Sequence, residues 1–275
     1  MTDLDSFSRL LQAIEPWRAH LVLVGGWAHR LHRCHPLASV PDYDPLITRD
    51  TDLAFKADAP LEGDIRSALA AAGFEEELSG DHNPPITHYA LGEDDAGFYA
   101  EFLTPLRGSG VKRNGEPDVT LAKAGITAQK LKHLDVLLVE PWRIRIGPEH
   151  GVHVPTRIDV QVANPVSFMV QKLLIQKYRP PAKRAQDVLY IHDTIELFGG
   201  SLPNLQRVWT DTVRPAIGAT TARNVLALSE NTFSRVTDML RDAARIPSDR
   251  SFSPERLRAS CELALAQILA ARSDN

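Results

Sequence analysis

The pattern of hydrophobic residues changes near residue 163, and this change constrains the fold more than any other feature of the sequence. Before it, short apolar runs of strand length are separated by loops and short helical segments. From Pro165 onward, apolar residues recur at helical spacing in longer segments. Strands mixed with helices favour a sheet covered by helices, whereas consecutive helical segments favour a helical bundle. We therefore predict an α+β fold with a mixed sheet and flanking helices, divided into an α/β domain over residues 1–163 and a helical domain over residues 164–275.

A glycine turn follows the first predicted strand of the α/β domain. Residues 20–24 read HLVLV and predict a short buried strand, which Gly25 and Gly26 end before a helix that we expect from Trp27. Glycines allow a close approach to the backbone, and the N–H groups at the start of a helix attract phosphate. A tight turn without a ligand would explain the two glycines equally well.

Two carboxylates lie on the next predicted strand, after a proline-rich loop over residues 34–47. Residues 50–55 read DTDLAF, so Asp50 and Asp52 are two positions apart and their side chains point to the same face of the strand. Paired carboxylate oxygens suit a hard divalent cation such as Mg²⁺. The alternative is a solvated strand face that binds nothing.

A third acid lies inside an apolar strand that we predict over residues 97–103. Glu101 is the only charged residue of this run, GFYAEFL, and a charge there is costly unless it is paired or bound to a metal. An exposed sheet edge is the alternative explanation. Asp159, on a strand predicted within residues 152–162, is the rival third carboxylate, but Arg157 offers it an ordinary salt bridge.

Basic residues gather at the start of the helical half. Lys172 lies between Val170 and Leu173 in a predicted helix, where its stem would be half buried and its ammonium group could hold a triphosphate, or simply extend to solvent. Asp187, on the next helix, could orient Lys172 or Lys183, or form a surface pair within its own helix.

Composition and charge exclude several classes of protein. No apolar run approaches the roughly 20 residues that cross a bilayer, so we expect no membrane association. The acidic N-terminus lacks signal-peptide character, and two distant cysteines do not form a disulfide framework, which together favour the cytoplasm. Residues 1–160 carry 16 Lys and Arg against 24 Asp and Glu, whereas residues 161–275 carry 15 against 11. An acidic half beside a basic half suits a metal site that faces an anionic substrate, but ordinary helices with exposed arginines explain the same imbalance.

Other motifs for nucleotide binding and hydrolysis are missing from the sequence. It contains no GxxxxGK[ST] loop, no GxGxxG after a strand, and neither GxSxG nor HExxH. The remaining pieces are VGGWAHR, TRDTDLAF, EFLTP, FMVQKLLIQKYR and KRAQDVLYI, in that order. In this combination, over about residues 20–195, the chain resembles the nucleotidyltransferase superfamily with its polymerase-β-like fold, and within it the AbiEii-like and related bacterial groups.

The resemblance implies a reaction and a set of roles. An NMP would move from an NTP to an acceptor hydroxyl, in a cleft that the helical domain completes. Asp50, Asp52 and Glu101 would bind two Mg²⁺ ions, with Mn²⁺ as a substitute, and Glu101 would also activate the acceptor. Lys172 would be a fourth catalytic residue, and the nucleotide would be bound by Gly25, Gly26, His29, Arg30, Lys183 and Asp187.

Two departures from the family pattern matter. The usual glycine–serine turn is Gly25–Gly26 here, so a serine contact to phosphate is lost, and Glu101 stands where many members have aspartate.

The resemblance leaves the acceptor open. It could be tRNA, which toxins of the AbiEii-like groups modify, or another RNA, a protein or a small molecule. An antitoxin partner would accompany a toxin role. A non-catalytic nucleotide- or RNA-binding module of the same fold is the alternative function, and a metal-dependent phosphohydrolase is a third.

Overall fold

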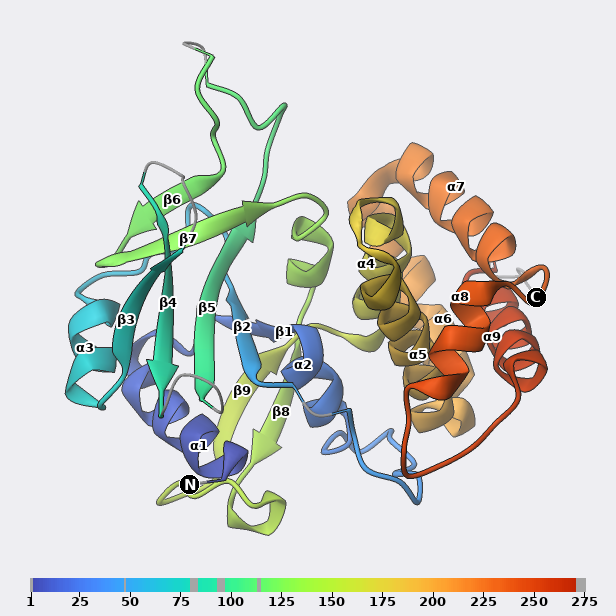
Figure 1. Ribbon diagram of the computed structural model, residues 1–275, viewed down its shortest axis with the longest axis horizontal. Helices are drawn as coiled ribbons and strands as arrows, with labels where there is room; N and C mark the ends of the chain where they lie inside the picture. The colour runs from blue at the N-terminus through green and yellow to red at the C-terminus, as the bar shows by residue number, and fades with distance from the viewer. Residues whose placement is uncertain (1, 47, 80–83, 93–96, 113–114, 271–275) are drawn as a thin grey trace. The chain divides into compact units, whose positions relative to one another are not determined.

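The chain forms two compact units in the computed structural model, which describes residues 2–46, 48–79, 84–92, 97–112 and 115–270 (Figure 1). Unit 1 comprises residues 1–34 and 47–163, and unit 2 comprises residues 35–46 and 164–275. The predicted α+β class is confirmed, because the described residues form a mixed sheet in unit 1 and a helical C-terminal region. The proline-rich segment 35–46 belongs to unit 2, although unit 1 supplies the elements on both sides of it.

Unit 1 contains a sheet of nine strands within the described residues. Seven of them lie in the order β3-β4-β5-β2-β1-β9-β8, while β7 pairs with β5 and β6 pairs with β7. Three pairs are parallel, namely β1 with β9, β2 with β5 and β5 with β7, and the other pairs are antiparallel. The strands are β1 (Val22–Val24), β2 (Asp50–Ala54), β3 (Glu75–Ser79), β4 (Ile86–Leu91), β5 (Phe98–Pro105), β6 (Thr120–Lys123), β7 (Ile126–Leu131), β8 (Trp142–Ile146) and β9 (Ile158–Val162).

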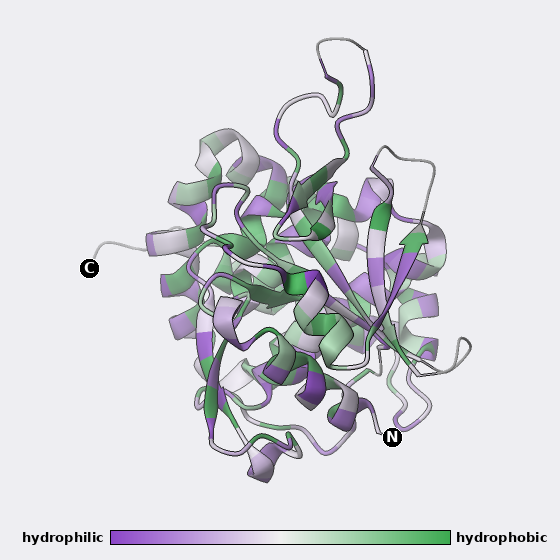
Figure 2. Cartoon of the chain, turned by 90° about the vertical axis from the view of Figure 1, so that its left-hand side faces the viewer, coloured by the Kyte–Doolittle hydropathy of each residue, from purple (hydrophilic) through white to green (hydrophobic). Residues whose placement is uncertain are grey.

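One face of this sheet is buried against three helices, α1 (Asp3–Ala13), α2 (Gly25–His32) and α3 (Ile65–Ala71). A capping box between Thr2 and Asp5 fixes the start of α1, and the Asp64 side chain caps α3. Phe7 of α1 stacks on Trp27 of α2, with ring centroids 3.9 Å apart, which adds about 0.5–1.5 kcal/mol to the burial of both rings. Hydrophobic and hydrophilic residues interleave along the elements that face the viewer in Figure 2, as expected of elements with one buried side.

The opposite face of the sheet has a smaller apolar cluster. Val22, Val24, Ala54 and Leu103 pack there against the short helix η2 (Asp135–Leu138). Because side chains alternate along a strand, Asp52 and Asp50, which lie two and four positions before Ala54, share this face. The cluster therefore ends where the polar part of β2 begins.

Unit 2 is helical apart from its connections. Nearly all of α4 is buried, and the Asn164 side chain caps it by accepting a 2.8 Å hydrogen bond from the Ser167 N–H group, with Pro165 at its first turn. None of the described helices of either unit is long and apolar enough to span a membrane. The helices are α4 (Pro165–Ile175), α5 (Pro181–Leu197), α6 (Leu202–Val208), α7 (Arg214–Phe233), α8 (Asp238–Arg245) and α9 (Pro254–Ile268), with a π-helical turn over Trp209–Val213. Short 3₁₀ turns occupy Gln176–Tyr178 and Gly199–Ser201 in this unit, and Glu15–Trp17 and Pro148–His150 in unit 1.

Several elements differ from the sequence-based expectation. The glycines, prolines and charges of residues 105–128 predict an exposed segment, but it contains β6 and the start of β7, which joins the sheet and buries Ile126 and Ala128. The strand β3 was not predicted, because its sequence EEELS is mostly charged. The spacing of apolar residues predicts one helix over residues 219–243, but the structure has two, since α7 ends at Phe233 and α8 begins at Asp238. The sequence GEDDA predicts a turn over residues 92–96, most of which lie outside the described residues.

Candidate active site

The two aspartates of β2 lie on the face of the sheet that the helices α1 to α3 do not cover. Asp50 and Asp52 are half-buried, whereas Thr51 and Leu53 between and after them point into the helix-covered core. The Thr48 hydroxyl donates a hydrogen bond to Asp50 Oδ1. The alternation of the strand therefore presents two carboxylates side by side, as the DTD sequence predicted.

Glu101 lies next to these aspartates on the neighbouring strand. In the parallel pair of β2 and β5, Asp52 is the register partner of Glu101, and Asp50 is the register partner of Tyr99. Neighbouring strands are about 4.8 Å apart, and register partners point to the same face. The structure thus gathers Asp50, Asp52 and Glu101, three residues from two distant segments, on one patch of the sheet.

The glycine turn closes this patch on its other side. Val24, the last residue of β1, is the register partner of Asp52, and α2 begins directly afterwards at Gly25. Gly25 has a φ of +63°, and a Cβ built on it would overlap Asp52 Oδ2 and lie 3.2 Å from Asp52 Cγ. The Asp52 carboxylate therefore occupies the space that only a glycine leaves open.

The start of α2 adds positive potential beside this carboxylate. No side chain caps the helix, and its first turn contains no acidic residue. Backbone N–H groups at a helix N-terminus attract anions, including carboxylates and phosphates. The turn at Gly25 and Gly26 therefore brings an anion-binding helix end next to Asp52.

The electrostatics of the patch indicate an excess of negative charge. Burial and the neighbouring Asp50 charge both raise the pKa of Glu101, whose side chain is 21% exposed. Burial, Asp50, Glu101 and Asp52 raise the pKa of Tyr99 to about 12. Because crowded carboxylates disfavour one another's ionised form, a bound cation would relieve this repulsion.

His88 of β4 contacts Glu101 from the strand on its other side. The two residues are register partners, and His88 Nε2 lies 3.4 Å from Glu101 Oε1. The His88 ring stacks on the Tyr99 ring, with centroids 5.9 Å apart, and burial lowers the pKa of His88. Sequence reasoning did not identify either residue, although the alternation along β5 places Tyr99 on the same face as Glu101.

The rival acid Asp159 has a different environment. It lies on β9, where Arg145 of β8 binds both of its carboxylate oxygens, at 2.8 Å and 3.2 Å. The expected partner Arg157 instead pairs with Glu149, at 2.7 Å. Arg145 lowers the pKa of Asp159, so this carboxylate is already neutralised by a neighbouring strand.

His29 and Arg30, the other predicted nucleotide-binding residues of unit 1, lie on α2. The His29 side chain is buried, with 2% of the residue exposed. The Arg30 guanidinium lies over the Trp27 ring, 4.8 Å from its centroid. This arrangement is a cation–π contact, which holds Arg30 along the helix.

The predicted residues of unit 2 form a buried ion pair. Lys172 Nζ lies 2.6 Å from Asp187 Oδ1, and the two side chains are 6% and 3% exposed. Lys172 Nζ also lies over the rings of Phe168 and Tyr190, at 5.3 Å and 5.1 Å from their centroids. Of the partners considered for Asp187, the structure selects Lys172, while Lys183 is exposed on the first turn of α5.

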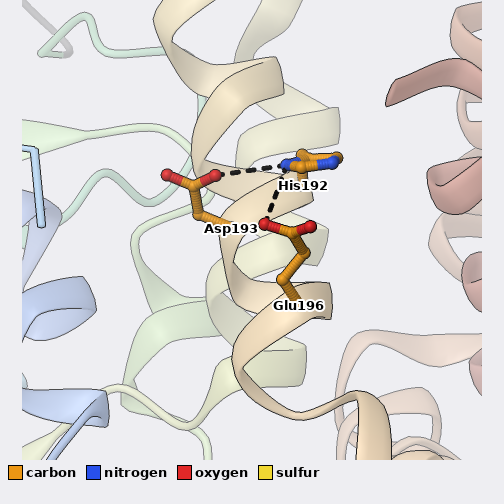
Figure 3. Close-up of side chains that lie close together, drawn as sticks. All are labelled: His192, Asp193 and Glu196. Atoms are coloured by element: carbon orange, nitrogen blue, oxygen red, sulfur yellow. Dashed lines mark hydrogen bonds and ion pairs between the residues drawn. The ribbon is translucent and has the colours of Figure 1, made fainter. Parts of the chain in front are cut away.

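A second polar cluster of unit 2 was not predicted from the sequence. His192 Nδ1 lies 3.2 Å from Asp193 Oδ1 and 3.8 Å from Glu196 Oε2, all on α5 (Figure 3). A histidine with two carboxylates is a ligand set that metals accept, and these atoms lie within 4.8 Å of one another. However, Arg250 Nη2 lies 2.5 Å from Asp193 Oδ2, and the Tyr43 hydroxyl donates a 2.8 Å hydrogen bond to Glu196. The protein's own donors thus already engage both carboxylates.

Comparison with known proteins identifies the family. A nucleotidyltransferase family matches residues 2–214. The chain belongs to this nucleotidyltransferase family. The matched range includes the glycine turn, the three acids of the sheet, and the helices α4 to α6. No curated protein matches the chain at a significant level. Membership confirms the resemblance at the superfamily level, supports nucleotidyl transfer as the general activity, and implies an NTP substrate.

Proposed function

We propose that the protein is a Mg²⁺-dependent nucleotidyltransferase that moves an NMP from an NTP to an acceptor hydroxyl. The observation that carries this proposal is the patch of Asp50, Asp52 and Glu101, which share one face of two paired strands beside the helix end at Gly25. Metal-assisted phosphoryl transfer uses ligand clusters of this kind, and the N–H groups of a helix end beside them attract phosphate.

The residues of the patch fit a divalent magnesium site. All three side chains offer carboxylate oxygens, the ligands that Mg²⁺ prefers, and Mn²⁺ would accept the same set. The raised pKa of Glu101 supports the fit, since the charge of Asp50 contributes to it and a cation would offset that repulsion. When bound, a pair of metal ions supplies charge neutralisation of the triphosphate and polarisation of the α-phosphate.

The chain's own residues would divide the remaining work. Asp50 and Asp52 hold their carboxylates toward the triphosphate side, and the backbone N–H groups of Gly25 and Gly26 bind phosphate oxygens. Glu101 accepts the proton of the acceptor hydroxyl at a carboxylate oxygen. The acceptor oxygen then forms a bond to the α-phosphorus as the bond from that phosphorus to the bridging oxygen breaks, and pyrophosphate leaves.

The other roles rest on the family resemblance. We propose, from the resemblance alone, that Lys172 neutralises charge on the triphosphate; in the structure its ammonium group is buried and lies 2.6 Å from Asp187 Oδ1. Arg30, His29 and Lys183 are proposed as further nucleotide contacts. RNA is our preferred acceptor class, and an AbiEii-like toxin role in the reducing cytoplasm, with an antitoxin partner, is the corresponding biological setting.

A transfer assay with labelled nucleotides tests the proposed function. The full chain is incubated with each α-labelled NTP, Mg²⁺ and total cellular RNA or lysate, and the labelled product is identified. Asp50→Asn and Asp52→Asn should each reduce transfer by at least about 100-fold, since a metal contributes several kcal/mol to transition-state stabilisation. Full transfer by the double variant would refute the proposal.

A matched control separates the site from general charge effects. Asp159→Asn removes an acid from the same sheet, where Arg145 already neutralises it, and should leave transfer unchanged. Calorimetric titration of Mg²⁺ gives an independent readout, because the Asp50→Asn and Asp52→Asn variants should lose binding that Asp159→Asn retains. Metal-dependent NTP binding without any transfer would favour the non-catalytic binding module.

A further inference from the structure

The connection between α4 and α5 gathers cationic side chains around an exposed aromatic ring. We name residues 177–184, with the sequence KYRPPAKR, the basic turn. It contains four basic residues and no acidic residue. Tyr178 is 52% exposed, and it is the one exposed large hydrophobic side chain in the described α4, α5 and the connection between them. The Lys177 ammonium lies over its ring, 4.9 Å from the centroid.

The basic turn is held in a defined conformation. Arg179 Nε donates to Asp187 Oδ2 at 3.3 Å, and the Asp187 carboxylate is itself fixed by the buried Lys172. Arg184 Nε donates a 2.7 Å hydrogen bond to the Arg179 carbonyl oxygen. Pro180 and Pro181 restrict the backbone between them, and Pro181 opens α5. The two arginines therefore lose little conformational freedom when they bind a ligand.

We propose that the basic turn binds a single-stranded nucleic acid. Tyr178 would stack on a base, and Lys177, Arg179 and Arg184 would contact the phosphates on either side. Sequence-tolerant binding of single strands combines these two elements, an exposed aromatic platform and cations that follow the backbone. This inference rests on the proposed function in one respect, because the bound strand would be the acceptor that carries the reacting hydroxyl.

The structure favours a single strand over other polyanions. A duplex hides the faces of its bases, so it would leave the exposed Tyr178 ring without a role. A membrane surface would require a broader apolar face than one aromatic side chain provides. An acidic protein segment would match the charge, but it would have no base to stack on the ring.

Binding by the full chain tests the proposal directly. The probes are labelled RNA and DNA oligonucleotides of the same mixed sequence, single-stranded and as duplexes, and fluorescence anisotropy is followed between about 50 and 200 mM salt. Tyr178→Ala should weaken single-strand binding about 5- to 150-fold, whereas Tyr178→Phe, which keeps the ring, should bind as the wild type does. The Lys177→Gln/Arg184→Gln variant should lower the slope of log K against log salt by about 1.4, since each phosphate contact of a single strand contributes about 0.7.

A matched variant removes the same charge elsewhere on unit 2. Arg241 and Arg245 are exposed on α8, so Arg241→Gln/Arg245→Gln should leave affinity and salt slope unchanged. The proposal is overturned if the wild type binds no single strand at low salt, if it binds duplexes as tightly, or if Tyr178→Ala binds like the wild type. An equal loss in the α8 variant would also overturn it. The RNA and DNA arms show which strand is preferred.

Transfer by the same variants separates this inference from the proposed function. If the wild type transfers nucleotide to RNA while the basic-turn variants bind and transfer normally, the proposal that the basic turn binds the strand is wrong and the enzymatic proposal stands. If the variants lose strand binding while the wild type transfers nothing to any acceptor, strand binding by the basic turn is confirmed and the enzymatic proposal fails. Asp52→Asn should bind single strands as the wild type does, because it lies outside the basic turn.

Discussion

Replacing Gly25 by alanine should damage unit 1 through two separable effects. The positive φ of +63° costs an alanine about 1–2 kcal/mol of unfolding free energy. The new Cβ would also overlap Asp52 Oδ2, and overpacking of this kind costs about 1–3 kcal/mol more. We therefore expect Gly25→Ala to lower the free energy of unfolding by about 2–5 kcal/mol, and to reduce nucleotide transfer further by displacing the carboxylate.

Gly63 provides the matched control for the backbone effect. Its φ is +82°, and a Cβ there would lie 3.5 Å from Trp17 Cζ2, an ordinary contact. Gly63→Ala should therefore cost only the conformational part, about 1–2 kcal/mol. Urea unfolding followed by tryptophan fluorescence measures both variants, and the difference between them reports the overlap with Asp52.

A double-mutant cycle assigns the extra cost to the carboxylate. In an Asp52→Ala background, the cost of Gly25→Ala should fall to the value found for Gly63→Ala, with a coupling energy of about 1–3 kcal/mol. If Gly25→Ala and Gly63→Ala cost the same, and the Asp52→Ala background changes nothing, then the glycine is not required by the carboxylate and the reasoning is wrong.

Two further substitutions test the electrostatics of the units. The raised pKa of Glu101 means that the folded state binds its proton more tightly than the unfolded chain does, so stability falls as the pH rises from the ordinary carboxyl value through the raised one. In metal-free buffer at neutral pH, Glu101→Gln should therefore be more stable than the wild type in urea unfolding, although it loses activity; equal stability at every pH would contradict the raised pKa. Asp187→Asn leaves the Lys172 ammonium buried without a charged partner and should cost about 3–5 kcal/mol of unfolding free energy. The control is Lys183→Met, on the exposed first turn of α5, which should change the free energy of unfolding by no more than about 0.5 kcal/mol. An equally small effect of Asp187→Asn would show that the ion pair is solvated.

The parts of the site that the sequence could predict are those with local signals. The alternation DTDLAF identifies both the strand and the shared face of its aspartates, and the two glycines identify the turn. The partnership of Asp52 with Glu101 could not be derived in this way, because it depends on parallel pairing between strands about fifty residues apart. The contact of His88 with Glu101 likewise follows only from the antiparallel register of β4 and β5.

Elements without a clear period were also beyond sequence reasoning. The charged strand β3 has the composition of a loop, and its pairing with β4 is what makes it a strand. The cluster of His192, Asp193 and Glu196 gives no signal along the sequence, since its partner Arg250 is 57 residues from Asp193 and Tyr43 is 153 residues from Glu196. Contacts of such separation are set by tertiary packing alone.

The segment 35–46 makes the two units inseparable by a single cut. The chain passes between units three times, near residues 34, 46 and 163. Within unit 2, Ser39 donates a backbone hydrogen bond to Leu197, and Tyr43 contacts Glu196 and lies under the Arg250 guanidinium. A fragment that ends at residue 163 would contain both the glycine turn and the DTD strand, yet the peptide that joins them would lack every one of these partners. During synthesis, this segment has its full set of partners only after Arg250 has been made, so the glycine turn and the DTD strand of the proposed metal site are joined by a loop that packs late.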